Sequence, residues 1–349
     1  MKLYAGLFDR IASFPNLLAA SRRAQMGKRF QRSVAEFNFN LEADLLRLRD
    51  ELLSGTWRPG EYRRFTVFEP KCREIVAAPY RDRVVHHALC GAVEPLFDRG
   101  FIEDSYACRQ RKGTHAALDR AHQFLRRSRF VLKCDVRKFF ASVDHATLDG
   151  LLSRKIACAR TLALMRRIIA FGARQRAVGL PIGNLTSQLF ANVYLNELDH
   201  FVKQGLRARL LDGTCAATAK GVNVKCQDLT PFRYVRYMDD FLVFGESKDE
   251  LAWAKAQIAR FLQDKLKLRL NEKKSFVSPV RVGVSFLGMR LFVCHRRLNG
   301  ANVTRFARKL AALKAASREL LASAQAWTAH AAHANTWHLR TRLLAGVAV

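Results

Sequence analysis

The sequence predicts a mixed α+β fold in which an antiparallel sheet is backed by helices. Apolar residues recur at helical spacing in residues 5–25 and 41–53. Residues 62–78 form two short strand-like runs around a turn with one proline and two cations, which predicts a hairpin. Residues 232–244 form two further apolar strands, here around a pair of adjacent acidic residues. Helices interleaved with hairpins are typical of the α+β class.

The other elements follow the same two patterns along the chain. Helical spacing predicts helices at 83–97, at 114–127, twice within 145–172, at 186–201 and at 248–268. Short apolar runs predict strands or hairpins at 130–136 and 285–291. From residue 304 onward Ala, Leu, Lys and Arg predominate, which indicates a small helical domain. Between 207 and 230 turn signals replace the pattern, so an inserted loop or small hairpin is expected there.

The charge of the chain points to a polyanionic partner. Sixty Lys and Arg face thirty Asp and Glu, for a formal net charge of +30. Such an excess repels itself in a compact chain, and binding to phosphates relieves it while releasing counterions. A merely basic protein and an acidic membrane surface are the alternatives. Nucleic acid is favoured over the membrane because no strongly amphipathic basic helix stands out.

Several other classes are excluded by composition. No run of about 18 uncharged apolar residues occurs, so no membrane span or membrane partner is expected. The N-terminus reaches charged residues before any long apolar run and does not resemble a signal peptide. The eight cysteines form no Cys-x-x-Cys pair and no zinc spacing, which indicates buried, reduced thiols. These features together predict a cytoplasmic protein.

Two acidic elements carry the chemistry. Asp239 and Asp240 are adjacent, and adjacent carboxylates resist burial in a strand, so we expect them at a hairpin turn. Asp135 lies at the end of the apolar strand predicted at 130–136, where burying a carboxylate is again energetically costly and therefore suggests a function. If the two strands are neighbours, Asp135 and Asp239 meet. Carboxylates so placed can hold two magnesium ions about 3.5–4 Å apart, which clamp the oxygens of a phosphoryl transfer. An ordinary acidic turn is the alternative.

These residues resemble the palm of reverse transcriptases. Asp135 followed by Phe139-Phe140, and then Tyr237-Met238-Asp239-Asp240, stand in that family's order. The resemblance covers about residues 60–295 and implies an RNA-directed DNA polymerase with a right-hand polymerase fold. It implies an N-terminal helical extension at 1–60, fingers and palm at 61–296 with the 207–230 loop inserted, and a helical thumb at 297–349. Asp135, Asp239 and Asp240 are then catalytic. Together with Val136 they hold two Mg²⁺ ions, for which Mn²⁺ can substitute.

The resemblance also implies a nucleotide site and a surface for template and primer. Phe140 lies five residues after Asp135, where a ring excludes a ribose 2′-hydroxyl. The implied nucleotide-binding residues are Lys71, Arg73, Arg109, Phe140, Ile182, Gly183 and Lys274. The implied template and primer contacts are Gln188, Tyr237, Met238, Phe286, Leu287 and Gly288. A solvated turn for the fingers cations and a core phenylalanine for Phe140 are the ordinary alternatives.

One loop resembles a particular branch, the reverse transcriptases of diversity-generating retroelements. Most of the family carries Gln-Gly-x-x-x-Ser-Pro there, whereas Ile182 and Gln188 stand in the first and last positions here. Isoleucine cannot make the hydrogen bond of a glutamine. Losing an orienting contact narrows the difference in binding energy between correct and incorrect nucleotides. We therefore expect low fidelity, and the resemblance implies errors opposite template adenine.

The same resemblance implies the wider setting. Such an enzyme copies an RNA template repeat into mutagenised cDNA from a DNA primer and deoxynucleoside triphosphates. It works with a small, basic, oligomeric accessory protein in a bacterial or phage-infected cell. Three alternatives stay open: another bacterial reverse transcriptase (defence-associated, retron or group II intron-like), a non-catalytic basic nucleic-acid-binding protein, and an RNA-templated RNA polymerase, which Phe140 disfavours.

Overall fold

The computed structural model describes residues 3–68, 72–173, 176–206, 232–312 and 318–345. The chain divides into two compact units, each assembled from separate segments. Unit 1 comprises 1–102, 136–200 and 259–269, and unit 2 comprises 103–135, 201–258 and 270–349. The inserted loop expected at 207–230 lies outside the described residues.

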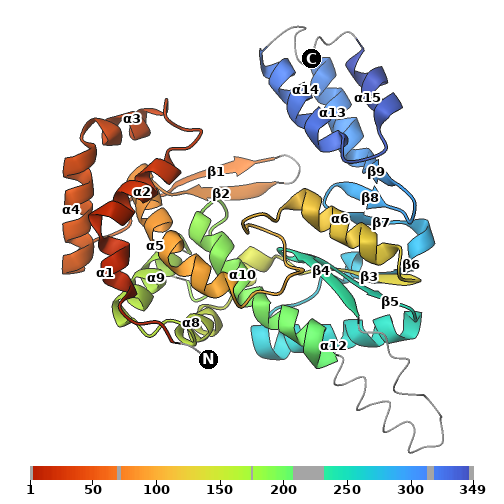
Figure 1. The fold of residues 1–349 in the computed structure, drawn as a ribbon, viewed down its shortest axis with the longest axis horizontal. Coiled ribbons are helices and arrows are strands. Elements are labelled where there is room, and N and C mark those ends of the chain that lie inside the picture. The colour runs from red at the N-terminus through yellow and green to blue at the C-terminus, as the bar shows by residue number, and fades with distance from the viewer. Residues whose placement is uncertain (1–2, 69–71, 174–175, 207–231, 313–317, 346–349) are drawn as a thin grey trace, which may run out of the picture. The chain divides into compact units, whose positions relative to one another are not determined.

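Unit 1 is mostly helical and carries one hairpin (Figure 1). Its elements are α1 (Leu7–Ala12), α2 (Phe14–Ala24), α3 (Arg32–Phe39), α4 (Leu41–Ser54), β1 (Arg63–Val67), β2 (Arg73–Ala77), α5 (Tyr80–Asp98), α7 (Phe139–Ser142), α8 (His145–Ser153), α9 (Ala159–Gly172) and α10 (Leu185–His200). The buried leucines 45, 48 and 52 of α4 recur at helical spacing, and Gly55 ends the helix with a φ of 74°. The expected hairpin is confirmed, with Phe65 paired to Ile75.

Unit 2 contains the sheets (Figure 1). Its elements are α6 (Thr114–Leu125), β3 (Phe130–Asp135), the π-helix η1 (Phe201–Gly205), β4 (Arg233–Tyr237), β5 (Asp240–Gly245), the 3₁₀ helices η3 (Glu272–Lys274) and η4 (Val280–Val282), β6 (Phe276–Pro279), β7 (Val284–Phe286), β8 (Met289–Leu291), β9 (Arg296–Leu298), α13 (Gly300–Ala312), α14 (Arg318–Ala331) and α15 (Trp337–Leu344). The boundary between the units falls within α12 (Lys248–Leu266).

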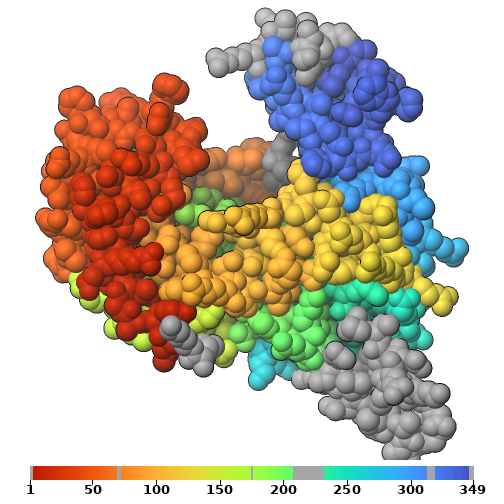
Figure 2. Space-filling model, viewed as in Figure 1, coloured from red at the N-terminus to blue at the C-terminus, as the bar shows by residue number. Residues whose placement is uncertain are grey.

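The main sheet of unit 2 has four antiparallel strands in the order β4-β5-β3-β6. The two central strands, β5 and β3, carry the longest apolar runs because both of their faces are covered. One core joins this sheet, α6 and the second sheet to the C-terminal helices. Phe306 and Trp327 stack within it at 4.1 Å between ring centroids. Figure 2 shows the C-terminal helices in dark blue standing beside α6 in yellow.

Several elements were not expected from the sequence, and three of them show why. β6 and β9 are strands of four and three residues, too short for an alternating pattern to show. β6 lies at the edge of its sheet and ends in Pro279, which removes a ladder donor. The third is α3, which has only eight residues. Among the described residues, no helix is both long and apolar enough to cross a bilayer.

Candidate active site

Asp239 lies in a tight hairpin turn, as expected, whereas Asp240 is the first residue of β5 and is largely buried, which was not expected. Tyr237 and Asp240 are register partners of β4 and β5, so Met238 and Asp239 form the two-residue loop. Met238 has a φ of 53°, a conformation that side chains other than glycine adopt at a cost. Strained backbone of this kind concentrates at functional sites, and here it directly precedes two successive carboxylates.

A buried arginine of β4 stabilises this turn through hydrogen bonds. Arg236 is fully buried in β4. Its guanidinium donates to the Met238 carbonyl at 3.3 Å and to the Ser105 hydroxyl at 3.0 Å. Its backbone also bonds to Asp104 and Tyr106 on the segment before α6. Sequence reasoning missed Arg236, although an arginine in the middle of a strand rich in apolar residues is a signal, since a buried charge needs partners.

Asp135 stands directly across from the acidic turn. The register of β3 and β5 pairs Asp135 with Asp240. The neighbouring strands predicted from the sequence are therefore present, and the catalytic candidates all belong to unit 2. Directly opposed residues of an antiparallel pair have Cβ atoms about 4.5–5.5 Å apart, which is close enough for two carboxylates to share cations.

Residues 271–275 hold Asp135 in place. The Asn271 side-chain amide donates to Oδ1 at 3.1 Å, and its backbone N–H donates to the Asp135 carbonyl at 2.8 Å. Lys274 Nζ lies 3.1 Å from Oδ2. The Asp135 N–H donates to the Ser275 hydroxyl at 3.3 Å. Lys274, expected to act on the nucleotide, thus forms an ion pair with a carboxylate that was predicted to be catalytic.

Asp240 is electrostatically the most perturbed of the acids. Burial raises its pKa to about 7; Asp135 and Asp239 also raise it, while Lys133 and Lys274 lower it. Its Oδ1 is buried without a hydrogen-bond partner. Lys133 Nζ lies 3.9 Å from that oxygen and donates instead to the Ser285 carbonyl at 2.6 Å. A buried, unsatisfied carboxylate oxygen is costly unless a cation completes it.

The donor set suits a hard divalent cation. Carboxylate oxygens are the ligands that Mg²⁺ prefers, and the buried Oδ1 of Asp240, which has no hydrogen-bond partner, is an oxygen that could bind one. Across the described residues, however, no three His, Cys, Asp or Glu side chains stand close enough to form a ready-made metal site. The ammonium of Lys274 occupies the position beside Asp135. The chemistry of the residues therefore fits the ion, and a metal would have to displace or share that contact.

The comparison with known proteins decides the family. Residues 69–291, more than half of the chain, match the family described as "Reverse transcriptase (RNA-dependent DNA polymerase)". The chain belongs to the reverse transcriptase family. It is accordingly an RNA-directed DNA polymerase, whose substrates are a template, a primer and deoxynucleoside triphosphates.

Relatives of this reverse transcriptase include intron-encoded proteins. Protein YkfC of Escherichia coli (strain K12) is 31% identical over 279 residues, 72% of each chain. Group II intron-encoded protein LtrA of Lactococcus lactis is 25% identical over 295 residues, 71% of this chain and 49% of that protein. Nuclear intron maturase 4 of Arabidopsis thaliana is 25% identical over 179 residues, 22% of its length. The chain thus spans about half the length of LtrA.

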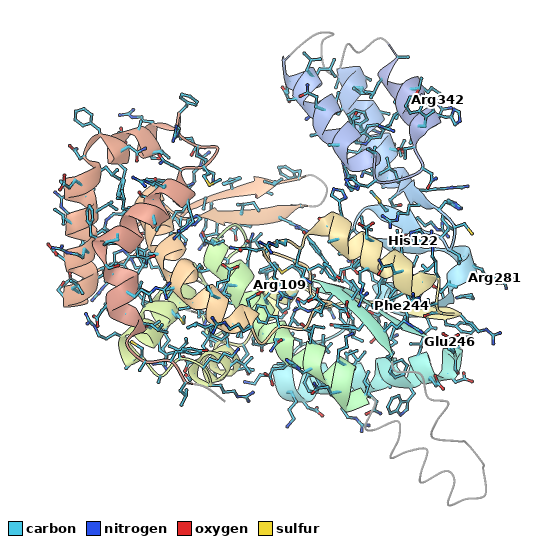
Figure 3. All side chains as sticks on the ribbon, in the orientation of Figure 1. Arg109, His122, Phe244, Glu246, Arg281 and Arg342 are labelled. Carbon is cyan, nitrogen blue, oxygen red and sulfur yellow. The ribbon has the colours of Figure 1, made fainter. Side chains whose placement is uncertain are left out.

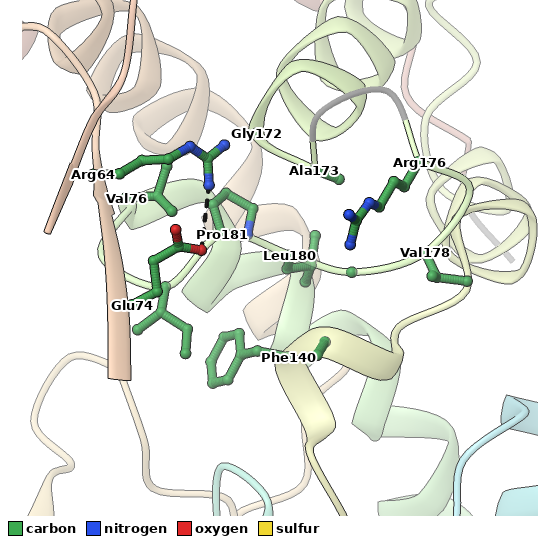
Figure 4. A pocket seen from close by; sticks show the side chains of 13 residues that line it. Arg64, Glu74, Val76, Phe140, Gly172, Ala173, Arg176, Val178, Leu180 and Pro181 are labelled. Atoms are coloured by element: carbon green, nitrogen blue, oxygen red, sulfur yellow. Dashed lines mark hydrogen bonds and ion pairs between the residues drawn. The ribbon is translucent and has the colours of Figure 1, made fainter. Parts of the chain in front are cut away.

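Two of the nucleotide-binding candidates of the reverse transcriptase share a pocket in unit 1. Phe140, at the start of α7, and Ile182 line a cavity of about 290 Å³ together with Arg64, Glu74 and Arg176. Arg64 and Glu74 form an ion pair at 3.5 Å. In Figure 4 the Phe140 ring points toward the strand that carries Glu74, and Arg176 approaches from the opposite wall.

Gly183 sets how closely the Ile182 loop approaches the hairpin. The Val76 N–H donates to the Ile182 carbonyl at 2.8 Å. Gly183 has a φ of 115°, and a Cβ there would lie 2.9 Å from Ile75 Cγ2 and 3.3 Å from the Val76 carbonyl. Only glycine fits both the conformation and the space. Gly183 therefore acts through backbone packing, which keeps Ile182 at the pocket.

The remaining candidates are dispersed. Lys71 lies outside the described residues, and Arg73 is exposed at the start of β2. Arg109, in the loop before α6 (Figure 3), donates to the Ser105 carbonyl at 2.9 Å. Gln188 is half-buried on α10. The Thr114 hydroxyl donates to Tyr237 Oη at 3.2 Å.

The predicted primer-contacting segment forms the β7–β8 turn. Phe286 pairs with Met289 across it, and the two loop residues Leu287 and Gly288 have φ of 48° and 84°. Two positive φ values in a two-residue loop are typical of a tight hairpin turn. Phe286 is buried, so it anchors the turn in the core, while the loop backbone is the part that remains for a ligand.

Proposed function

We propose that this reverse transcriptase makes error-prone cDNA from an RNA template repeat of a diversity-generating retroelement. The observation that carries the proposal is Ile182 beside Phe140 in the unit 1 pocket. Two of the polar side chains of that pocket, Arg64 and Glu74, already form an ion pair with each other. An apolar side chain where a relative offers a glutamine leaves an incoming base with one fewer directional contact.

The proposed catalysis uses Asp135, Asp239 and Asp240, with the Val136 carbonyl, as ligands of two Mg²⁺ ions. When bound, such ions activate a primer 3′-hydroxyl and stabilise the departing pyrophosphate. Arg236 fixes the turn that carries Asp239, and Asn271 orients Asp135. Lys274 neutralises Asp135 before substrate arrives, and its ammonium would then stabilise the charge of the departing pyrophosphate. Phe140 excludes ribonucleotides by occupying the space of a 2′-hydroxyl.

The proposed setting is a bacterial or phage-infected cytoplasm, with a small, basic, oligomeric accessory protein. The net charge of +30 supports a nucleic-acid partner. An accessory protein with an acidic surface could bind this positive charge directly. A basic accessory protein is repelled by it, and would associate through nucleic acid that both proteins bind. The proposal therefore places the RNA between the two proteins.

Fidelity measurements test the proposal. Primer extension on a defined RNA template with magnesium and all four deoxynucleotides is sequenced for wild type, Ile182→Gln and the apolar control Ile182→Leu. We expect errors concentrated at template adenines in wild type and Ile182→Leu, and fewer in Ile182→Gln. Asp239→Asn serves as the inactive control. Faithful copying by wild type would contradict the retroelement assignment and leave the polymerase intact.

A group II intron-like enzyme is the second candidate, because LtrA and other similar proteins are named for introns. It predicts faithful copying of long templates. The same sequencing experiment separates it from the first, since the two differ in error rate at adenines and not in the ability to make DNA.

A further inference from the structure

A second pocket in unit 1, distinct from the one that contains Ile182, is lined mostly by cations. It measures about 340 Å³ and is lined by Arg137, Lys138, Ser142, Lys267 and Arg269. Four of the five lining side chains are cations and none is acidic. These four cations are exposed, so water screens them in part, and an anion bound between them would relieve the repulsion that remains.

The backbone holds this pocket in a defined shape. The Arg137 N–H donates to the Arg269 carbonyl at 2.8 Å, which fastens the two cationic segments together. The buried Tyr194 donates its hydroxyl to the Leu266 carbonyl at 2.6 Å and so anchors the turn before Lys267. Lys138 and Lys267 have φ of 47° and 51°, conformations that cost energy for side chains other than glycine.

Most of the charge in this pocket is uncompensated. Lys267 pairs with Asp144 at 2.8 Å, and that carboxylate also caps α8 through Thr147. Within the described part of the chain, no carboxylate pairs with Arg137, Lys138 or Arg269. Arginine forks and a serine hydroxyl supply the donors that phosphate oxygens accept.

We infer that Arg137, Lys138 and Arg269, with Ser142 and Lys267, form a phosphate-binding pocket. Arg137 follows Asp135 by two residues, and Arg269 precedes its partner Asn271 by two. The phosphate can come from pyrophosphate, the product of nucleotide addition, or from the backbone of bound RNA. The inference rests on the polymerase activity and not on the retroelement assignment.

Two binding experiments on the full chain test the pocket. The variant is Arg137→Gln/Arg269→Gln. The control is Arg10→Gln/Arg22→Gln, which removes the same charge from two exposed arginines of α1 and α2. Calorimetry without divalent metal measures the affinity for inorganic pyrophosphate. Fluorescence anisotropy measures the affinity for single-stranded RNA at several salt concentrations. Thermal unfolding checks that both variants remain folded.

We expect the pocket variant to bind pyrophosphate about tenfold or more weakly, since each charge-assisted hydrogen bond contributes that much. That result with unchanged RNA binding supports pyrophosphate as the ligand. If instead pyrophosphate binding is unchanged and the slope of log RNA affinity against log salt concentration becomes shallower by about one, the ligand is the phosphate backbone of RNA. Equal behaviour of the pocket variant and the control, or no change in either measurement, overturns the inference. Neither readout depends on fidelity, so failure of the retroelement proposal is seen separately.

Discussion

Asp135 and Asp240 are directly opposed across the two central strands of the unit 2 sheet, and each has a different lysine nearby. Lys274 lies 3.1 Å from the Asp135 carboxylate, whereas Lys133 lies 3.9 Å from Asp240. The two acids therefore differ in how their charge is compensated. Asp135 is hydrogen-bonded on both oxygens, and Asp240 keeps one buried oxygen without a partner. This asymmetry makes Asp240 the residue that depends most on a bound cation.

Asp240→Asn is expected to abolish DNA synthesis while stabilising the metal-free fold above pH 7. Burial raises the pKa of Asp240 to about 7, above the value of an unfolded aspartate. Its contribution to stability is therefore fully present below the pKa of the unfolded aspartate and is lost progressively as pH rises from there to about 7, because the folded state must then hold a buried charge. Asparagine avoids this cost, and we expect a gain of about 2 to 4 kcal/mol at pH 8. Urea unfolding with a chelator at pH 5 and pH 8 measures it. An equal effect at both pH values would contradict the assigned cause.

Magnesium activation of this enzyme should weaken below pH 7 for the same reason. Protonation of Asp240 removes a carboxylate ligand, so the magnesium concentration for half-maximal primer extension should rise as pH falls from 8 to 6. Titrations at fixed ionic strength measure this shift. A pH-independent midpoint would show that Asp240 is not a ligand.

Lys274→Met is expected to tighten magnesium activation and to slow catalysis. The ammonium of Lys274 competes with any cation at Asp135, so its removal should lower the half-maximal magnesium concentration severalfold. The maximal rate should fall about tenfold to a hundredfold if Lys274 also assists the leaving group. Lys273→Met, at the neighbouring position, is the control. Loss of rate with no change in the magnesium midpoint would separate the two roles.

Arg236→Lys should impair activity far more than Arg233→Lys. Arg236 is fully buried, and its fork reaches both Met238 and Ser105, which a lysine cannot do at once. We expect a loss of about 2 to 4 kcal/mol in unfolding free energy or at least a tenfold loss in rate. Arg233 on the same strand is partly exposed and pairs with Ser128 and with Glu246, labelled in Figure 3. Similar losses in both variants would show that the strand, and not the turn, is what Arg236 supports.

Gly183→Ala is expected to destabilise the fold more than Gly113→Ala. Both glycines have a φ of 115°, so alanine is equally strained in backbone conformation at either position. A Cβ at Gly183 meets Ile75 at 2.9 Å, whereas one at Gly113 meets nothing within 4 Å. The difference should be about 1 to 3 kcal/mol in unfolding free energy, the usual cost of overpacking. Equal costs would show that the close approach to β2 relaxes freely.

The sequence by itself determined most of the longer helices and strands and the order of the blocks proposed to be catalytic. Adjacent aspartates between apolar strands predict a turn, because burying carboxylates is costly, and Asp239 lies in that turn. Asp240 instead begins β5 and is largely buried, which the sequence did not predict. The strand before Asp135 could also be predicted, because its apolar residues form a short continuous run. The short edge strand β6 could not, because four residues carry too little periodicity.

Tertiary structure alone decided which side chains meet. Lys274 lies on Asp135 although 139 residues separate them, and Arg236 bonds to Ser105 across 131 residues. No local pattern encodes such contacts, because strand order and register bring the partners together only after the sheet has formed. The perturbed pKa of Asp240 has the same origin. Its main cause is burial, to which charged residues of β3, the β4–β5 turn and η3 add, and burial is a property of the folded packing and not of the chain.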